Sequence, residues 1–211
     1  MKPYLNFQYL FPPRPEIKAP HSVIKQYEGQ NFIAQPKLNG SCAVLFTDGH
    51  QVIMMNRHKD TFSRDLLIDK EELKKLHKGE GWLVLTGEYM NKSKKDSQGK
   101  LFNGKFVIFD ILVYQNQYLT GSTFSERQIL LDNLYSLKPY DKFISQIESH
   151  LYRVNNITTN ITQSWEEIIK TDMYEGFVLK KPTGSLDTGY RSDNNTGWQL
   201  KIRKPTKNYQ Y

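Results

Sequence analysis

Several short segments, spread in a fixed order along the chain, carry residue types suited to phosphoryl-transfer chemistry. Residues 37–40 place a lysine three positions before a glycine, and a deprotonated lysine amine is a nucleophile. Residues 87–88 and 175–176 each join a glutamate to a glycine, and carboxylates suit Mg²⁺. Residues 198–204 are rich in Lys and Arg, which offset the charge that builds on a phosphoryl group under attack. Together these types indicate a site for a phosphorylated substrate.

No single segment is decisive. A lysine three positions before a glycine occurs at Lys37, Lys78 and Lys181. Only Lys37 is followed in order by Asn56-Arg57 and the other segments. The order therefore identifies Lys37 as the candidate nucleophile.

Strand patterns surround this lysine. We expect strands at 32–37, 41–47 and 51–56, with a hairpin turn at Asp48-Gly49. Lys37 then lies where a strand opens into a loop. The continuous apolar run at 105–113 predicts a central strand covered on both faces.

Helices and loops complete a predicted α+β order. The capping-box spacings of Thr123 with Glu126 and of Ser164 with Glu167 predict helices at 124–137 and 165–171. Residues 91–104 hold four lysines and two glycines and should form an exposed loop. The other expected elements are an extended proline-rich strap at 11–20, helices at 21–27 and 69–77, and strands at 82–85, 177–180 and 198–203.

This arrangement resembles the nucleotidyltransferase domain of the covalent nucleotidyltransferase superfamily, which contains ATP-dependent DNA ligases, RNA ligases and mRNA capping enzymes. The resemblance covers roughly residues 30–204 and includes the ligase-like run Phe-Val-Ile-Phe-Asp-Ile-Leu at 106–112. It implies an α+β, ATP-grasp-like adenylation domain with antiparallel sheets flanked by helices. We expect one such domain over residues 1–211 and no oligonucleotide-binding (OB) barrel.

The resemblance also implies a reaction. Lys37 would attack the α-phosphate of ATP, carry AMP covalently, and pass it to a 5′-phosphate that a 3′-hydroxyl then joins. The amine must first lose a proton, and an unperturbed lysine pKa is about 10.4. Lys180, Lys201, Arg203 and a bound metal would lower the pKa of Lys37 by crowding it with positive charge.

Individual roles follow from the same resemblance. Arg57 and Glu88 would hold the ribose and phosphate, Phe109 would stack on adenine, and Glu175 would bind Mg²⁺ or Mn²⁺. The backbone of Gln35 would read the adenine amino group. The implied catalytic residues are Lys37, Lys201 and Arg203. The implied nucleotide-binding residues are Gln35, Lys37, Gly40, Arg57, Glu88, Phe109, Glu175, Lys180 and Lys201.

Three departures from the family pattern stand out. Thr86 occupies a position where many relatives have Asp, and Arg203 replaces a more common lysine. The sequence also ends seven residues after Lys204, which leaves no room for an OB barrel. The chain is then a minimal ligase, acts with another protein, or is part of a longer protein.

The nucleic acid is the main alternative left open. The Phe-Asp-Ile-Leu run and the Gly-Tyr-Arg-Ser segment at 189–192 favour a nicked DNA duplex, whereas residues 37–40 and 87–90 also suit RNA ligases. A module that binds nucleic acid without catalysis, using the basic loop 91–105, is a third reading. Against it, Lys37, Glu88 and Glu175 are all present.

Composition agrees with a polyanionic partner. The formal charge is +7 and the pI is about 9.3, and Lys or Arg that neutralise phosphates release counterions. Cys42 is the only cysteine, so an intramolecular disulfide and a cysteine-rich metal site are excluded. No segment approaches the roughly 20 apolar residues that span a bilayer. We expect a monomer in the cytosol without membrane contact, and a small ligase of this kind suggests a phage or bacterial setting in DNA repair or replication.

Overall fold

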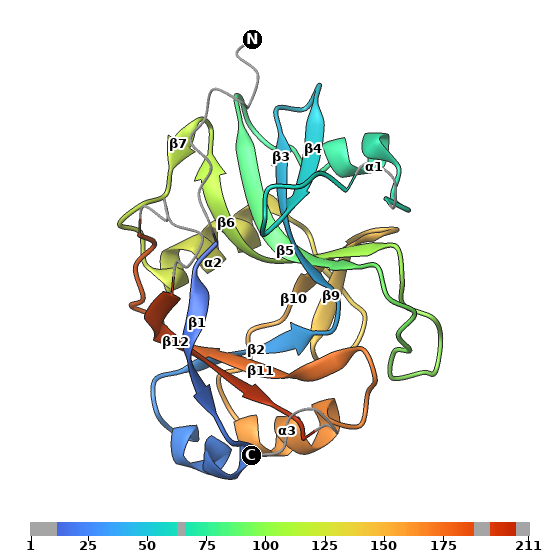
Figure 1. Ribbon diagram of the computed structural model, residues 1–211. Helices are drawn as coiled ribbons and strands as arrows, with labels where there is room; N and C mark the ends of the chain where they lie inside the picture. Colours follow the sequence, from blue (N-terminus) through green and yellow to red (C-terminus); the bar gives the residue numbers. More distant parts are fainter. Residues whose placement is uncertain (1–11, 63–65, 188–194, 206–211) are drawn as a thin grey trace.

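The computed structural model describes residues 12–62, 66–187 and 195–205. Two β-sheets dominate it, with few helices (Figure 1). The helices are η2 (His21–Tyr27, a 3₁₀ helix), α1 (Lys70–Lys74), α2 (Phe124–Leu134) and α3 (Ile161–Ile168). No helix among the described residues is long and apolar enough to cross a membrane.

The smaller sheet, sheet A, has four strands in the order β1-β12-β11-β2. Their bounds are β1 Arg14–Ala19, β12 Asn195–Arg203, β11 Tyr174–Lys180 and β2 Ile33–Leu38. β1 runs parallel to β12, and the other two pairings are antiparallel. The proline-rich strap of the sequence thus supplies an edge strand beside the last strand of the chain.

The larger sheet, sheet B, has eight strands in the order β4-β3-β5-β6-β10-β9-β8, with β7 paired to β6. Their bounds are β3 Ser41–Thr47, β4 Val52–Asn56, β5 Leu83–Met90, β6 Lys105–Tyr114, β7 Gln117–Tyr118, β8 Lys138–Pro139, β9 Ile144–Glu148 and β10 Leu151–Val154. Only β10 with β6 is parallel among the pairings of this sheet in the described residues. The predicted α+β adenylation fold with antiparallel sheets is confirmed, with one parallel pair in each sheet.

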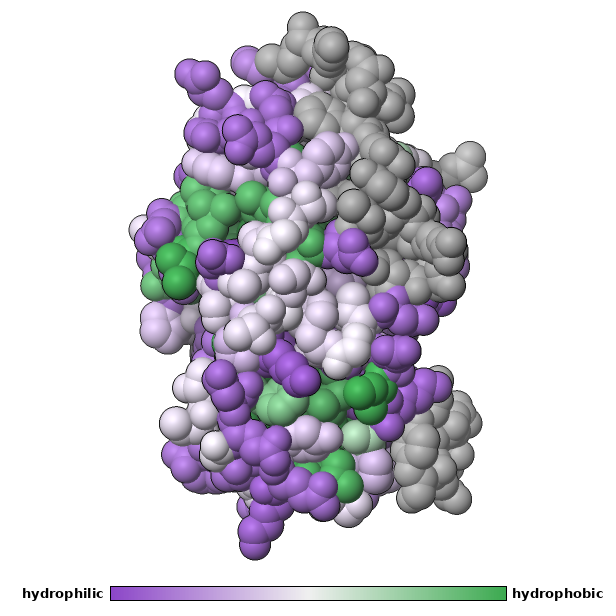
Figure 2. Space-filling view, turned by 90° about the vertical axis from the view of Figure 1, so that its left-hand side faces the viewer, coloured by the Kyte–Doolittle hydropathy of each residue, from purple (hydrophilic) through white to green (hydrophobic). Residues whose placement is uncertain are grey.

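Helices cover one face of sheet A. Trp165 and Ile168 of α3 and Ile24 of η2 share a buried cluster with Phe177 of β11 and Ile202 of β12. Burial of such side chains stabilises the fold by about 1.5–3 kcal/mol each. Because neighbouring residues of a strand point to opposite faces, the next residues along β11 and β12 face sheet B. Figure 2 shows that hydrophilic residues cover much of one side of the molecule and that hydrophobic residues gather there in separate patches.

One predicted helix start is confirmed and one is wrong. Thr123 caps α2, with the Glu126 amide donating to Thr123 Oγ1 (3.3 Å) and the Thr123 amide to Glu126 Oε2 (2.7 Å). Ser164 is not a cap. It lies inside α3, and its hydroxyl donates to the Asn160 carbonyl (2.8 Å).

The physical reason lies far away in the sequence. The first amides of α3, those of Ile161 and Thr162, donate to the Glu28 carboxylate at 3.1 and 2.8 Å. These bonds lower the pKa of Glu28. The Glu28 carboxylate, at the end of η2, therefore accepts the hydrogen bonds of the first α3 amides. The spacing of residues near α3 cannot predict a contact so distant in sequence.

Other element boundaries differ from the predicted ones. β5 and β11 are longer than predicted, so Glu88 and Glu175 lie within strands instead of beside them. α1 ends at Lys74, before the predicted end at 77. β7 to β10 were not predicted. The Gly-Tyr-Arg-Ser segment lies outside the described residues.

Candidate active site

Strands β2, β11 and β12 bring distant motifs into register. Residues that face each other across neighbouring strands lie side by side on one face of the sheet. Two such rows hold most of the predicted cations: Lys37, Gly176 and Arg203 in the first, and Gln35, Val178 and Lys201 in the second. In a third row Lys180 lies opposite Gln199. The sheet thus converts three separate segments into one basic surface.

Gly176 makes the first row possible. Its φ is +139°, and a Cβ there would lie 2.2 Å from the Ile202 carbonyl oxygen and 3.0 Å from the Trp165 ring. Real Cβ atoms do not approach a backbone oxygen so closely. Glycine therefore allows Glu175 to stand beside Lys37 and Arg203 in a tightly packed sheet.

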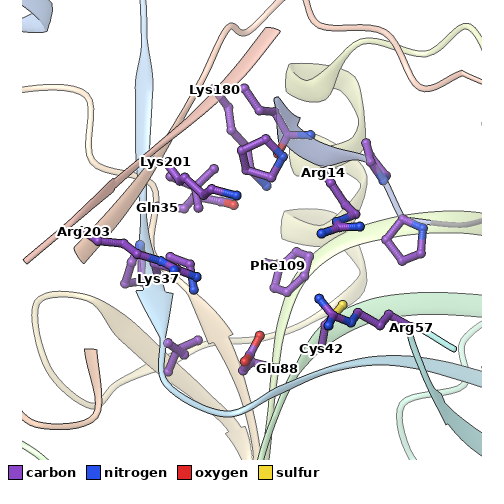
Figure 3. Close-up of a pocket in the computed structure, with 17 residues that line it drawn as sticks. Arg14, Gln35, Lys37, Cys42, Arg57, Glu88, Phe109, Lys180, Lys201 and Arg203 are labelled. Atoms are coloured by element: carbon purple, nitrogen blue, oxygen red, sulfur yellow. The ribbon is translucent and has the colours of Figure 1, made fainter. Parts of the chain in front are cut away.

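Sheet B supplies the opposite wall. Glu88 comes from β5, Phe109 from β6, and Arg57 follows the end of β4. A cavity of about 200 Å³ lies between the two walls (Figure 3). The predicted residues that line it are Gln35, Lys37, Arg57, Glu88, Phe109, Lys180, Lys201 and Arg203.

The two remaining predicted residues, Glu175 and Gly40, contact the lining. Lys37 Nζ donates to Glu175 Oε2 in an ion pair, and Arg203 Nε lies 3.4 Å from the same oxygen. The carboxylate thereby fixes both cations at one end of the cavity.

Gly40 ties the nucleophile segment to sheet B. Its amide donates to Glu88 Oε1 at 3.1 Å. A Cβ at this position would lie 2.5 Å from the Tyr89 carbonyl oxygen. The loop between β2 and β3 can therefore pass close against β5 only with glycine here, and this holds Lys37 near Glu88.

Glu88 carries an unusual charge state. Burial is the main cause that raises its pKa to about 7, and the negative charge of Glu175 adds to this, while Lys37 and the Gly40 amide lower it. Glu88 therefore releases its proton at a higher pH than an ordinary carboxyl group does.

Lys180 lies buried between two aromatic rings. Its Nζ is 5.2 Å from the Phe109 ring centroid and 4.6 Å from that of Phe124, distances typical of cation–π contacts. Burial, helped by the positive charge of Arg127, lowers the pKa of Lys180 to about 8, and Asp110 opposes this.

The stack continues behind Lys180. Arg127 lies 5.8 Å from the Phe124 ring and 5.7 Å from the Trp198 ring, so rings and cations alternate. Arg127 also donates two bonds to the Asp110 carboxylate, at 2.8 and 3.0 Å. Since Asp110 adjoins Phe109 on β6, this buried pair fixes the backbone that carries the ring at the cavity.

Gln35 presents an unsatisfied acceptor. Its Nε2 donates to Gln128 Oε1 (3.2 Å) and Asn156 Oδ1 (2.8 Å). Its Oε1 is buried and has no hydrogen-bond partner in the described part of the chain. An orphaned buried acceptor costs about 1–3 kcal/mol. A ligand with an amino group would remove that cost.

Positive charge dominates the cavity. Six cations surround it, against the two carboxylates Glu88 and Glu175. Burial and the neighbouring cations, Arg203 first, lower the pKa of Lys201. The cations are Arg14, Lys37, Arg57, Lys180, Lys201 and Arg203. Such an excess favours a ligand with several negative charges.

A family model identifies the family of this chain. The model described as "ATP dependent DNA ligase domain" matches residues 91–201, which is more than half of the chain. The chain belongs to this family. No curated protein matches its sequence.

Solved structures agree with the ligase fold. A mycobacterial DNA ligase D complexed with ATP and MES has a TM-score of 0.69 and 16% identity, over 94% of this chain and 61% of that one. The Chlorella virus DNA ligase-adenylate has a TM-score of 0.53 and 17% identity, over 90% of this chain and 68% of that one. A Lig E DNA ligase has a TM-score of 0.52 and 14% identity, over 92% and 69%. The chain thus spans about six tenths of the mycobacterial ligase.

Sequence reasoning missed other lining residues of this ligase domain. Val178 and Gln199 lie two positions from Lys180 and Lys201, so strand alternation could have found them. Cys42 faces Glu88 across β3 and β5, and burial together with the Glu88 charge raises its pKa to about 12. Arg14 gave no local signal, because only the pairing of β1 with β12 brings it to the cavity.

The carboxylates at the cavity are too few to hold a divalent metal without further ligands. The described residues contain no group of three or more His, Cys, Asp and Glu side chains that could hold a metal. Mg²⁺ is usually held by one or two carboxylates together with substrate phosphates. Glu175, with Glu88 close enough to feel its charge, fits an ion that is bound jointly with a nucleotide.

Proposed function

We propose that the chain is an ATP-dependent polynucleotide ligase that works as a monomer, carries AMP on Lys37 and seals 5′-phosphate/3′-hydroxyl breaks in a nicked duplex, with DNA favoured. One observation carries the proposal. The Lys37 amine stands at the edge of a cation-lined cavity that also presents an aromatic ring and a buried orphaned acceptor. These features complement a purine nucleoside triphosphate.

The residues then have the following proposed roles. Adenine lies against Phe109, and Lys180 lies behind the ring. The adenine amino group donates to the orphaned side-chain acceptor Gln35 Oε1, instead of to the Gln35 backbone that the resemblance implies. Arg57 and Glu88 hold the ribose and phosphate. Lys201 and Arg203 neutralise the α-phosphate, which lies near Lys37 because their rows adjoin it.

The first step forms a bond between Lys37 Nζ and the α-phosphorus and breaks the bond from that phosphorus to the bridging oxygen. The electron pair leaves with pyrophosphate. The ammonium proton passes to solvent through the Glu175 carboxylate that contacts it. In later steps AMP moves to a 5′-phosphate, and a 3′-hydroxyl displaces it.

Mg²⁺ or Mn²⁺, held by Glu175 together with nucleotide oxygens, would neutralise phosphate charge when bound. Lys201 and Arg203 provide the same kind of stabilisation from fixed positions in β12.

The family match and the DNA ligases among the structural relatives support DNA over RNA as the substrate. An RNA ligase with the same chemistry is the second candidate, supported by the segments at 37–40 and 87–90. The proposed setting is the cytosol of a phage-infected or bacterial cell, in DNA repair or replication.

Covalent labelling tests this function. Protein treated with pyrophosphate to remove bound AMP is incubated with α-labelled ATP and Mg²⁺ and run on a denaturing gel. We expect label on the wild type and none on Lys37→Ala. Lys78→Ala and Lys181→Ala change exposed lysines in the same Lys-x-x-Gly spacing and should label normally. An unlabelled wild type would refute the proposal and favour a nucleic-acid-binding module.

A further inference from the structure

Arg14 is a cation of the cavity that has no assigned task. It lines the cavity together with Pro12, Pro13 and Pro15. The side chain is exposed, and its guanidinium has no hydrogen-bond or ion-pair partner among the residues that the structure describes. An unpaired guanidinium at the mouth of a basic cavity is a ready binding group for an anion.

The backbone holds Arg14 in place. Pairing with β12 fixes the strand that Arg14 begins, and the Thr196 hydroxyl donates to the Arg14 carbonyl at 3.3 Å. The three neighbouring prolines have φ fixed near −65°, so little backbone freedom is left to lose when a ligand binds. The backbone therefore holds the start of the Arg14 side chain at a fixed place beside the cavity.

The position of Arg14 relative to Lys37 suggests which anion it meets. In Figure 3 Lys37 and Arg203 lie on one side of the cavity, whereas Arg14 and Arg57 lie on the other, with Phe109 nearer the second pair. Phosphoryl transfer places the attacking atom and the leaving oxygen roughly in line. The leaving pyrophosphate must therefore depart on the side opposite Lys37, which is the side where Arg14 lies.

Arg57 lies on the same side of the cavity, where its Nε donates to His58 Nε2 at 3.0 Å. Its proposed task is to hold the ribose and phosphate together with Glu88. The other cations are assigned elsewhere, since Lys37 and Arg203 contact Glu175 and Lys180 lies between rings. Lys201 lies in the row beside that of Lys37. Among the lining residues that the structure describes, Arg14 is thus an unpaired cation on the far side of the cavity from Lys37.

We infer that Arg14 binds the β- and γ-phosphates of ATP and stabilises the leaving pyrophosphate during adenylylation of Lys37. The inference rests on the proposed ligase function. As the bond from the α-phosphorus to its bridging oxygen breaks, the electron pair and negative charge pass to the pyrophosphate, which the guanidinium contacts. In the reverse reaction Arg14 holds the attacking pyrophosphate.

Equilibrium binding tests this without any chemistry. Calorimetric titrations with α,β-methylene-ATP, which cannot release pyrophosphate, and with AMP compare wild type, Arg14→Gln and Arg14→Lys. We expect Arg14→Gln to weaken the triphosphate analogue about 10- to 100-fold, the range of a lost charged hydrogen bond, and AMP by less than about threefold. Arg14→Lys should lie between, because a point charge replaces a planar fork.

Lys25→Gln is the matched control, since it removes the positive charge of an exposed side chain of the nearby helix η2 without touching the cavity. It should bind both ligands like wild type. Circular dichroism and melting temperature establish that Arg14→Gln is folded. Equal weakening of AMP and the analogue, or no weakening of either, would overturn the inference.

Pyrophosphorolysis gives a second readout. With AMP-labelled protein, Arg14→Gln should need about tenfold more pyrophosphate for half-maximal release of ATP. An unchanged pyrophosphate dependence would reject the assignment. If the proposed ligase function is wrong, the wild type carries no covalent AMP. The binding comparison does not depend on that result.

Discussion

Glu88 shows how one residue links the stability of the fold to pH. Its carboxyl group is partly buried at the wall of the cavity near Glu175 and Lys37, and burial raises its pKa to about 7 from an ordinary value of 4.5. Between these two pH values the folded protein keeps a proton that the unfolded chain has released. Stability from this group is therefore fully present below about pH 4.5 and is lost as the pH rises through 7.

Glu88→Gln should remove this dependence. Between pH 5 and 8 the unfolding free energy of wild type should fall, relative to the variant, on the order of 2 kcal/mol. Urea titrations at several pH values measure it. Glu16→Gln, an exposed glutamate of β1, serves as the control and should follow wild type. Parallel curves for wild type and Glu88→Gln would show that Glu88 ionises normally.

At the residue scale, the site residues that could be predicted are those that stand in short recognisable motifs. Lys37, Glu88, Phe109 and Lys201 each stand in a recognisable local segment, and all four line the cavity. Arg14 stands among prolines with no chemical motif around it, and its place depends on a pairing between the first and last strands. The catalytic and binding roles of Lys37, Glu88, Phe109 and Lys201 stay predictions.

At the scale of elements, α2 is joined to β6 by the buried pair of Arg127 and Asp110. Both side chains are almost completely buried, and Arg127 also donates to the Ser122 carbonyl at 2.7 Å. Removing one partner would leave an uncompensated charge in the interior, which costs more than the pair itself contributes.

Arg127→Met should therefore lower the unfolding free energy by about 3–5 kcal/mol, whereas Asp110→Leu combined with Arg127→Met should recover most of that loss. Urea denaturation of the two variants and wild type measures the coupling. A double variant as unstable as Arg127→Met alone would mean that packing of Arg127, against Phe124 and Trp198, outweighs its charge.

Elements with a clear local pattern were predicted correctly, among them β3, β6 and the cap of α2. β9 and β10 were not, because polar residues interrupt their apolar pattern. Arg153 of β10 is nevertheless buried, and its two terminal nitrogens donate to Asp132 and Gln128 of α2. A polar residue of a strand can thus be buried when residues distant in sequence bind it, and the local pattern does not show this.

At the scale of the whole molecule, an excess of seven positive charges predicts salt-sensitive binding of nucleic acid. The affinity of the adenylylated protein for a nicked DNA duplex should fall at least about tenfold between 50 and 200 mM salt. Fluorescence anisotropy measures it, with an intact duplex as the control. A flat salt response would contradict a phosphate-based interface.

Sealing assays on duplexes that differ only in the strand carrying the 3′-hydroxyl separate DNA from RNA as substrate. We expect the all-DNA nick to be sealed faster. Faster sealing of the RNA strand would assign the domain to RNA repair while leaving the lysine chemistry intact.

The parallel pairing of β1 with β12 also has a consequence for protein synthesis. Lys37 leaves the ribosome early, but Lys201 and Arg203 emerge more than 160 residues later, and β1 has no partner strand until β12 arrives. Long-range pairings of this kind form slowly. We therefore expect an unfinished chain, which carries the nucleophile without these cations, not to form the lysine-AMP intermediate.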